Sequence, residues 1–169
     1  MRRHSQPAAR QETTELLLVC STGGHLLQLL ALRPAWTDRE RLWVTFDKSD
    51  ARSLLAGENV VYANGPTNWT FGLRALRNQV RNLRLAVRLV RRHRPRAVLT
   101  TGAGLAVPFA LVARLRGAKV IYVESLTRVH GPSLACRAIR PFAHRLYVQW
   151  PELAEVLKGA RYEGNVFQP

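Results

Sequence analysis

Short apolar segments bounded by polar residues recur along the 169-residue chain, and segments with hydrophobic residues at three- and four-residue spacing separate them. The short runs are typical of buried strands, and the periodic segments are typical of amphipathic helices. The pattern predicts strands at residues 16–20, 41–46, 60–63, 96–100, 119–123 and 145–149. It predicts helices at residues 26–35, 49–55, 71–92, 105–116, 132–139 and 151–158.

This alternation of strands and helices predicts an α/β fold, with a Rossmann-like, mostly parallel sheet covered by helices on both faces. Met1–Glu15 is polar and charged, and we expect it to form a flexible tail before a single domain at residues 16–169. The longest apolar stretch, Leu105–Ala113, contains Pro108 and is much shorter than the roughly 20 residues of a membrane span. We therefore expect no membrane-spanning helix.

A glycine pair follows the first predicted strand, in the run Ser21-Thr22-Gly23-Gly24-His25. Paired glycines let backbone N–H groups approach an anion closely, and the N-terminus of the next helix adds partial positive charge. A phosphate cradle and a simple tight turn both fit this run. Because ligands of parallel sheets bind beyond the carboxyl ends of the strands, we expect these residues to converge with Gly102–Gly104 and with Glu124-Ser125.

The chain is strongly basic, with 26 Lys and Arg against 11 Asp and Glu, a formal charge of +15. Such an excess indicates an anionic partner, namely a nucleic acid, an acidic membrane surface or a phosphorylated substrate. Between Glu58 and Glu124 no acidic residue occurs, so the middle of the chain is a cationic block. Zinc-type spacing and basic–aromatic recognition motifs are absent from the sequence, which argues against nucleic acid. Cys20 and Cys136 lie in apolar surroundings and are predicted to be reduced core residues.

The predicted helix at residues 71–92 carries two stripes at helical spacing. We expect one of them to face the core, and it consists of Leu73, Leu76, Val80, Leu83, Val87 and Val90. The other is a basic ribbon of Arg74, Arg77, Arg81, Arg84, Arg88 and Arg91. A solvated face and a surface docked on an anionic bilayer are both open for this ribbon, and its single sign of charge favours the bilayer. Trp69, Phe71 and Leu85 would add shallow apolar contact.

Several motifs, in the same order along the chain, carry a resemblance to a known family. They are residues 21–25, 100–104, 123–129, 132–134, 147–153 and 162–166. The sequence resembles the acceptor-side, membrane-associating subunit of the two-component N-acetylglucosaminyltransferase of asparagine-linked glycosylation, and more closely its bacterial counterparts in exopolysaccharide and capsule synthesis.

The resemblance implies the N-terminal half of a glycosyltransferase-B fold, with a separate UDP-sugar-binding subunit as partner. It also implies a lipid-linked, undecaprenyl-type diphosphate acceptor, and we expect peripheral attachment to the cytoplasmic face of the membrane. No cofactor and no metal are expected. A non-catalytic scaffold that recruits a glycosyltransferase, and a basic nucleic-acid-binding module, are the alternatives.

Glycosyl transfer needs a base for the acceptor hydroxyl and positive groups or N–H donors for phosphate. His25 is the first candidate base, with phosphate orientation as its alternative, and Glu124 is the second, with a buried ion pair to Arg128 as its alternative. The predicted acceptor or phosphate ligands are Ser21, Thr22, Gly23, Gly24, Gly102, Gly104, Ser125 and Arg128. The predicted partner interface is Gln149, Trp150, Val166 and Phe167, although the polar groups of Ser125, Ser133 and Gln149 would also suit sugar hydroxyls or capping.

Overall fold

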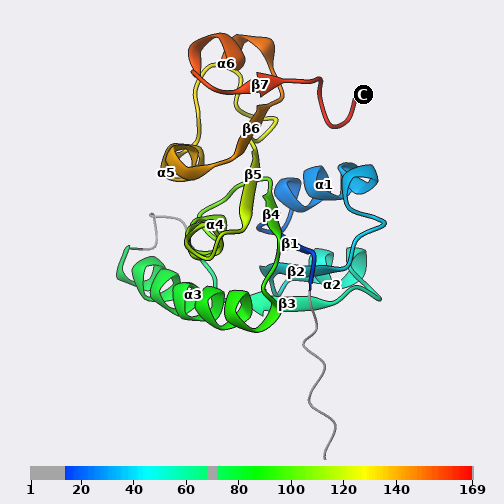
Figure 1. The fold of residues 1–169 in the computed structure, drawn as a ribbon, viewed down its shortest axis with the longest axis vertical. Coiled ribbons are helices and arrows are strands. Elements are labelled where there is room, and N and C mark those ends of the chain that lie inside the picture. Colours follow the sequence, from blue (N-terminus) through cyan, green and yellow to red (C-terminus); the bar gives the residue numbers. More distant parts are fainter. Residues whose placement is uncertain (1–13, 68–71, 169) are drawn as a thin grey trace, which may run out of the picture.

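A computed structural model describes residues 14–67 and 72–168, and it confirms an α/β fold built on one parallel sheet (Figure 1). The strands are β1 (Leu16–Val19), β2 (Arg41–Phe46), β3 (Val60–Ala63), β4 (Ala97–Thr100), β5 (Lys119–Val123), β6 (Arg145–Val148) and β7 (Arg161–Tyr162). All six predicted strands are present. The two-residue β7 was not predicted, because so short a strand has no hydrophobic period to detect.

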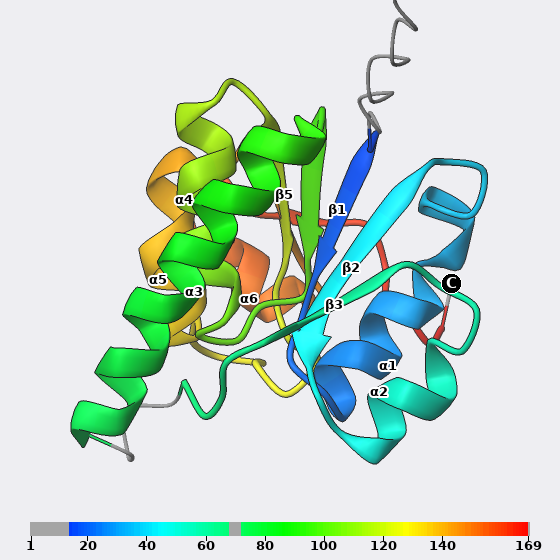
Figure 2. The same cartoon turned by 90° about the horizontal axis from the view of Figure 1, so that it is seen from below.

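Helices cover both faces of the sheet, as predicted (Figure 2). They are α1 (Gly24–Ala31), α2 (Ser49–Leu54), α3 (Gly72–His93), α4 (Ala106–Leu115), α5 (Leu134–Ile139) and α6 (Pro151–Val156), with 3-10 turns at Arg33–Ala35 and Arg140–Phe142. Alternate residues of β1 point to opposite faces. Leu16 and Leu18 pack in the core under α1 and α2, whereas Leu17 and Val19 pack in the core under α3 and α4.

The strand order is β3-β2-β1-β4-β5-β6-β7, and every pairing is parallel. The order reverses between β1 and β4, which lie side by side with Val19 opposite Thr100. In an open parallel sheet this reversal leaves a crevice at the carboxyl ends of the two strands. The loops after β1 and β4 therefore meet at the place where the sequence predicts a site.

The structure shifts some predicted boundaries. Thr14 and Glu15, assigned to the predicted tail, belong to the fold, because the Thr14 N–H donates to the His93 carbonyl and Glu15 O accepts from Arg96 N and Ala97 N. The rest of that tail lies outside the described residues, as do the predicted helix start at Phe71 and the predicted membrane contact of Trp69. The predicted core cysteines are buried and free, and burial raises the pKa of each thiol to about 12.

The long helix α3 is present, but the prediction of its buried face was wrong. The predicted core stripe is largely exposed, with Leu73 at 85%, Leu76 at 51% and Val80 at 45% of full side-chain accessibility. Leu83 and Val87 are exposed too, and only Val90 of the six is buried. The face that meets the protein carries small and amide side chains instead, and its buried residues are Ala75, Asn78, Asn82, Ala86, Leu89, Val90 and His93. Small residues let α3 lie close against α4.

Helix α3 thus has an inner face that packs on the protein and an outer face that carries two stripes, one of arginines and one of apolar residues. The six predicted arginines are all exposed, beside the exposed leucines and valines. Among the described salt bridges none involves these arginines, so their charge is not neutralised by a carboxylate of the chain's described part. Within residues 14–67 and 72–168, no helix combines the length and the apolar character that crossing a bilayer needs.

Because α3 has one exposed and one buried face, we expect substitutions on the two faces to change the free energy of unfolding by different amounts. The double variant Leu76→Gln/Leu83→Gln should change the free energy of unfolding by less than about 0.5 kcal/mol, because both side chains are exposed and Gln is a good helix former. Leu89→Ala should lower it by about 2–4 kcal/mol, because Leu89 is buried. Urea unfolding followed by circular dichroism measures both. Equal losses would contradict the exposed orientation of the stripe.

Candidate functional site

The first turn of α1, which follows β1, and the loop that follows β4 are joined by two reciprocal hydrogen bonds. His25 Nδ1 lies 2.7 Å from the carbonyl oxygen of Thr101, and the Thr101 hydroxyl donates to the His25 carbonyl at 2.7 Å. The two predicted glycine loops therefore do converge, as the sequence implies.

The partner of His25 fixes its tautomer. A carbonyl oxygen can only accept, so Nδ1 of His25 must carry the proton in the bond to Thr101. In a neutral imidazole the other nitrogen, Nε2, then keeps its lone pair. His25 is partly exposed. The arrangement gives the residue a fixed ring orientation and a free basic nitrogen, which are two of the properties of a general base.

Gly102 lies where a side chain has no room. Its φ is +101°, and a Cβ there would lie 2.7 Å from the hydroxyl oxygen of Tyr122 and 3.6 Å from Cε1 of His25. The positive φ and the short distance to the Tyr122 hydroxyl both require glycine, whereas 3.6 Å to the His25 ring is an ordinary contact distance. This tight packing is a structural reason for a glycine at position 102. It is independent of any contact between this loop and a phosphate.

The glycine pair after β1 already binds an anionic group. Gly23 N, at the start of α1, donates to Oδ2 of Asp50 at 2.7 Å. The N–H group that was predicted to face a phosphate is therefore occupied by a carboxylate of the chain itself. A helix N-terminus favours such a group, so the geometry agrees with the predicted preference for anions. A phosphate would have to displace Asp50 or bind beside it.

A cavity of about 810 Å³ opens next to this loop, at the carboxyl edge of β1 to β4. Its lining includes the predicted ligands Ser21, Thr22 and Gly104. Lys48 and Arg74 add two cationic side chains, while Asp47 on the same wall is held in an ion pair with Arg52. That ion pair lowers the pKa of the Asp47 carboxyl. The cavity has the charge and the hydrogen-bonding groups that bind a phosphate-containing ligand.

Neither of the two cationic residues that line this cavity was assigned to the site from the sequence. Arg74 was placed only in the membrane-facing ribbon, and Lys48 was not singled out. The signal for Lys48 was its position immediately after the Asp47 that follows β2, at the edge where ligands bind. For Arg74 the signal was absent, because its place depends on the path of the chain between β3 and α3.

Glu124 lies beneath the same edge and is completely buried. Oε1 accepts from Ser125 N at 2.8 Å and from the Tyr122 hydroxyl at 3.3 Å, and Oε2 accepts from Ser133 N at 2.8 Å. Burial, followed by the charge of Glu124, raises the pKa of Tyr122. With both carboxylate oxygens engaged and no exposure, Glu124 is built to hold the loop from residue 125 to Ser133, and this geometry favours anchoring over proton transfer.

Arg128 is not the partner of Glu124. Its side chain is exposed, and the described ion pairs do not join the two residues. Ser125 is buried, and its hydroxyl bonds to that of Thr127 at 3.1 Å. Ser133 caps α5 by accepting from Cys136 N, which is the capping alternative left open for it. Of Ser125, Arg128 and Ser133, only Arg128 is exposed, but it does not line the 810 Å³ cavity.

The predicted partner interface divides between the inside and the outside of the protein. Gln149 is only 2% exposed and its amide bonds to Gln28, to the Glu124 carbonyl and to Val166 N. Trp150 donates from its indole to the Leu126 carbonyl at 2.6 Å. Phe167, in contrast, is 51% exposed. Gln149 therefore supports this region from within, and it has no free group for a sugar hydroxyl.

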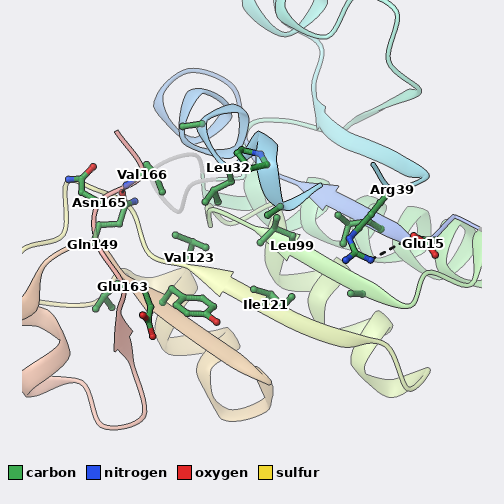
Figure 3. A pocket seen from close by; sticks show the side chains of 18 of the residues that line it. Glu15, Leu32, Arg39, Leu99, Ile121, Val123, Gln149, Glu163, Asn165 and Val166 are labelled. Atoms are coloured by element: carbon green, nitrogen blue, oxygen red, sulfur yellow. Dashed lines mark hydrogen bonds and ion pairs between the residues drawn. The ribbon is translucent and has the colours of Figure 1, made fainter. Parts of the chain in front are cut away.

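A second cavity, of about 680 Å³, lies on the face of the sheet opposite α4 and α5 (Figure 3). Leu99, Ile121 and Val123 form its apolar floor, with Leu32 and Val166 on its walls. The pair Glu15–Arg39 closes one end. Ala31 at the end of α1 and Pro34 and Ala35 of the following 3-10 turn also line the cavity, and of the three floor residues Ile121 alone is partly exposed.

The described residues contain no cluster of three or more His, Cys, Asp or Glu side chains that would suit a metal ion. The candidate chemistry thus rests on His25, on the cationic cavity and on backbone N–H groups.

Comparison with known proteins gives a family match over residues 72–166, more than half of the chain, to "Oligosaccharide biosynthesis protein Alg14 like". The UDP-N-acetylglucosamine transferase subunit ALG14 of Yarrowia lipolytica is 38% identical over 86 residues, covering 47% of this chain and 40% of that protein. The protein of the same description from Mus musculus is 26% identical over 183 residues, covering 92% of this chain and 84% of that protein.

Among solved structures, the crystal structure of Acinetobacter baumannii MurG matches with a TM-score of 0.69 at 17% identity. The match covers 88% of this chain and 45% of that chain, so the protein has the fold of one half of a glycosyltransferase-B enzyme. The chain aligns with less than half the length of both MurG and the Yarrowia protein.

Proposed function

Since this chain belongs to the Alg14-like family of oligosaccharide biosynthesis proteins, we propose that it is the acceptor-binding subunit of a two-component UDP-sugar glycosyltransferase. A separate subunit would bind the UDP-sugar, and the active site would form between the two. The acceptor would be a diphosphate linked to a lipid of the undecaprenyl type. We place the protein at the cytoplasmic face of the membrane as a peripheral component, in the bacterial branch of the family that makes exopolysaccharide or capsule.

The observation that carries this proposal is the position of the cationic cavity beside the exposed stripe of α3. Arg74 lines the cavity, and Leu73, its neighbour in the chain, is the most exposed large apolar residue of the protein's described part. A lipid-linked diphosphate has a charged head joined directly to an apolar chain. The cavity suits the head, and the apolar stripe lies at the bilayer surface from which the lipid comes.

Membrane docking would use both stripes on the outer face of α3. Each arginine held near an anionic leaflet contributes about 1 kcal/mol, and this attraction weakens as salt screens it. Leu76, Val80 and Leu83 would enter the interface and add a contribution that salt does not screen. The predicted contacts of Phe71 and Trp69 lie outside the described residues, whereas the predicted contact of Leu85 is wrong, because Leu85 is partly buried and packs against the core.

In the transfer step, the acceptor hydroxyl oxygen bonds to the anomeric carbon of the sugar as the bond to UDP breaks. The hydroxyl proton needs a base, and Nε2 of His25 has the free lone pair for it. Lys48 and Arg74 would hold the acceptor diphosphate in the adjacent cavity. Glu124 would keep the loop of residues 125–133 in place.

The partner subunit would cover the open face of the sheet. Parallel sheets are normally covered on both faces, and on the floor of this cavity Leu99 and Val123 are buried while Ile121 is only partly buried, so a partner that covers Ile121 would gain from its burial. MurG has more than twice the length that this chain matches, and in this proposal the separate subunit supplies the other half. Val166 and Phe167 lie at the edge of this face and extend it.

The first test of the proposal uses His25 in the reconstituted complex, with a UDP-sugar-binding subunit from the neighbouring reading frame. The isolated chain should neither transfer sugar nor bind UDP-N-acetylglucosamine at micromolar concentration. In the complex, His25→Asn retains a donor near the position of Nδ1 but has no base, so kcat should fall about 10²–10⁴-fold. His25→Gln should fall similarly.

Activity within about tenfold of the wild type for His25→Asn would show that the residue only holds the Thr101 loop. Full activity of both variants would favour the non-catalytic scaffold. The matched control is His130→Asn, at an exposed histidine of the 125–133 loop, which should leave kcat unchanged.

The second test concerns the partner surface. Ile121→Glu places a charge on the floor of the 680 Å³ cavity and should abolish co-purification with the partner, while the far-ultraviolet circular dichroism stays native. Truncation after Glu163, which removes Val166 and Phe167, should have the same effect. Leu115→Glu, at an exposed position of α4, is the control and should co-purify normally. Retained co-purification of Ile121→Glu would exclude this face as the interface.

The third test concerns the membrane. Vesicles with phosphatidylglycerol or cardiolipin should sediment the protein far better than neutral vesicles, and added salt should weaken but not abolish the binding. Arg77→Gln/Arg81→Gln/Arg84→Gln/Arg88→Gln should lose the salt-sensitive part. Leu76→Gln/Leu83→Gln should lose the salt-resistant part. Equal sedimentation with neutral and acidic vesicles would contradict the role of the ribbon and direct attention to nucleic acid.

A further inference from the structure

The inner face of α3 carries three amide side chains that bond to the walls of the cationic cavity. One wall consists of residues 63–67, from the last residue of β3 onward, and the other consists of residues 103–104, after β4. Asn78 and Asn82 are buried, at 5% and 0% exposure, and Gln79 is partly buried. A helix that packs against a protein normally buries apolar side chains. In this part of α3 the amides face inward, while Leu76, Val80 and Leu83 are exposed.

Asn82 makes the most complete contact. Its Oδ1 accepts from the backbone N–H of Asn64 at 2.8 Å and from the Asn64 amide at 3.2 Å, and its Nδ2 donates to the Asn64 carbonyl at 2.8 Å. Both backbone groups of one residue are thus held by one side chain. Asn64 lies between Ala63 and Gly65, and both of these line the cavity.

The other two amides hold the neighbouring parts of the wall. Asn78 donates to the Pro66 carbonyl at 2.9 Å, and Gln79 donates to the Gly104 carbonyl at 2.8 Å. At Gly104 the two walls touch, since a Cβ there would lie 3.0 Å from the Thr67 carbonyl oxygen and 3.3 Å from Nε2 of Gln79. One turn of α3 therefore fixes both walls of the cavity.

We infer that Asn78, Gln79 and Asn82 are positioning residues that tie the acceptor cavity to the membrane-facing helix, so that docking of α3 on a lipid surface orders the cavity walls. The inference rests on the proposed function. Its physical basis is that a buried amide is costly unless bonded, so the walls cannot move away from α3 without leaving these groups unpaired. The outer stripe and the inner amides belong to the same helical turns. When the outer stripe is held at a lipid surface, the amides and the wall residues bonded to them are held with it.

The test compares wild type with Gln79→Met, which keeps the side-chain length but cannot donate to Gly104, and with Asn82→Ala. Hydrogen–deuterium exchange of residues 64–67 and 103–104 is measured with and without phosphatidylglycerol vesicles. In wild type, vesicles should slow exchange in these walls about fivefold. In both variants this protection should be lost, while sedimentation with the vesicles and protection within α3 remain. The control is Asn59→Ala, which removes an exposed amide just before β3, at the opposite edge of the sheet.

A kinetic measurement on the reconstituted complex separates positioning from general damage. Gln79→Met should raise KM for a lipid-linked diphosphate acceptor in vesicles about fivefold, with KM for the UDP-sugar unchanged. Gln79→Lys, which restores a donor, should recover most of the loss.

The outcomes distinguish this inference from the function it rests on. Wild-type protein that sediments with vesicles without protection of the walls, or variants that keep the protection, would overturn the inference alone. Absence of sugar transfer by the wild-type complex would overturn the proposed function, and the exchange measurement would still decide the coupling. Absence of wild-type sedimentation with anionic vesicles would overturn both membrane docking and the coupling.

Discussion

The paired hydrogen bonds between His25 and Thr101 are the contact on which the carboxyl edge of the sheet depends. They join the loops of two strands, β1 and β4, that are neighbours in the sheet but 76 residues apart between the bonded groups. The same contact sets the ring orientation and tautomer of His25. Gly102, the next residue after Thr101, has to be glycine because its φ is positive and the hydroxyl of Tyr122 lies where a Cβ would be. Tyr122 in turn bonds to Glu124, so one set of contacts connects the candidate base to the loop that Glu124 holds.

Helix α3 shows how an ordinary hydrophobic period can mislead. Its leucines and valines have the spacing of a core-facing stripe, but the space between α3 and α4 is filled by Ala75 and Ala86, which allow close approach. The amides of Asn78 and Asn82 complete that face because the loop after β3 offers them backbone partners. Burial of the amides is favourable only with those partners, and exposure of the apolar stripe is favourable only against another apolar phase. The helix therefore makes physical sense as a connection between the cavity and a lipid surface.

The sequence was sufficient to predict the sheet and the edge at which the candidate site lies. It was insufficient for side chains whose burial depends on bonds to residues that are distant in the sequence. Alternating apolar runs located six strands, and the glycine loops were correctly expected to meet, because parallel strands bring their carboxyl ends together. The face of α3 could not be obtained from periodicity, since the bonded partners of Asn82 lie 18 residues away. The burial of Gln149 was equally hidden, because its partner Gln28 is 121 residues away in the chain. The bond from Gly23 to Asp50 was not predicted either, since short-range patterns do not report which loop lies opposite a helix N-terminus.

That bond has a consequence for how the protein would obtain its acceptor. A diphosphate entering the cationic cavity meets Lys48 and Arg74, but the backbone N–H of Gly23 already donates to Asp50 and is not available to the phosphate. The cavity alone would thus bind small phosphates weakly. A lipid-linked acceptor has a second source of binding free energy in the bilayer, where it is concentrated at the surface on which α3 would dock. Weak recognition of the head group combined with membrane attachment would favour a lipid-linked acceptor over phosphates that are free in solution.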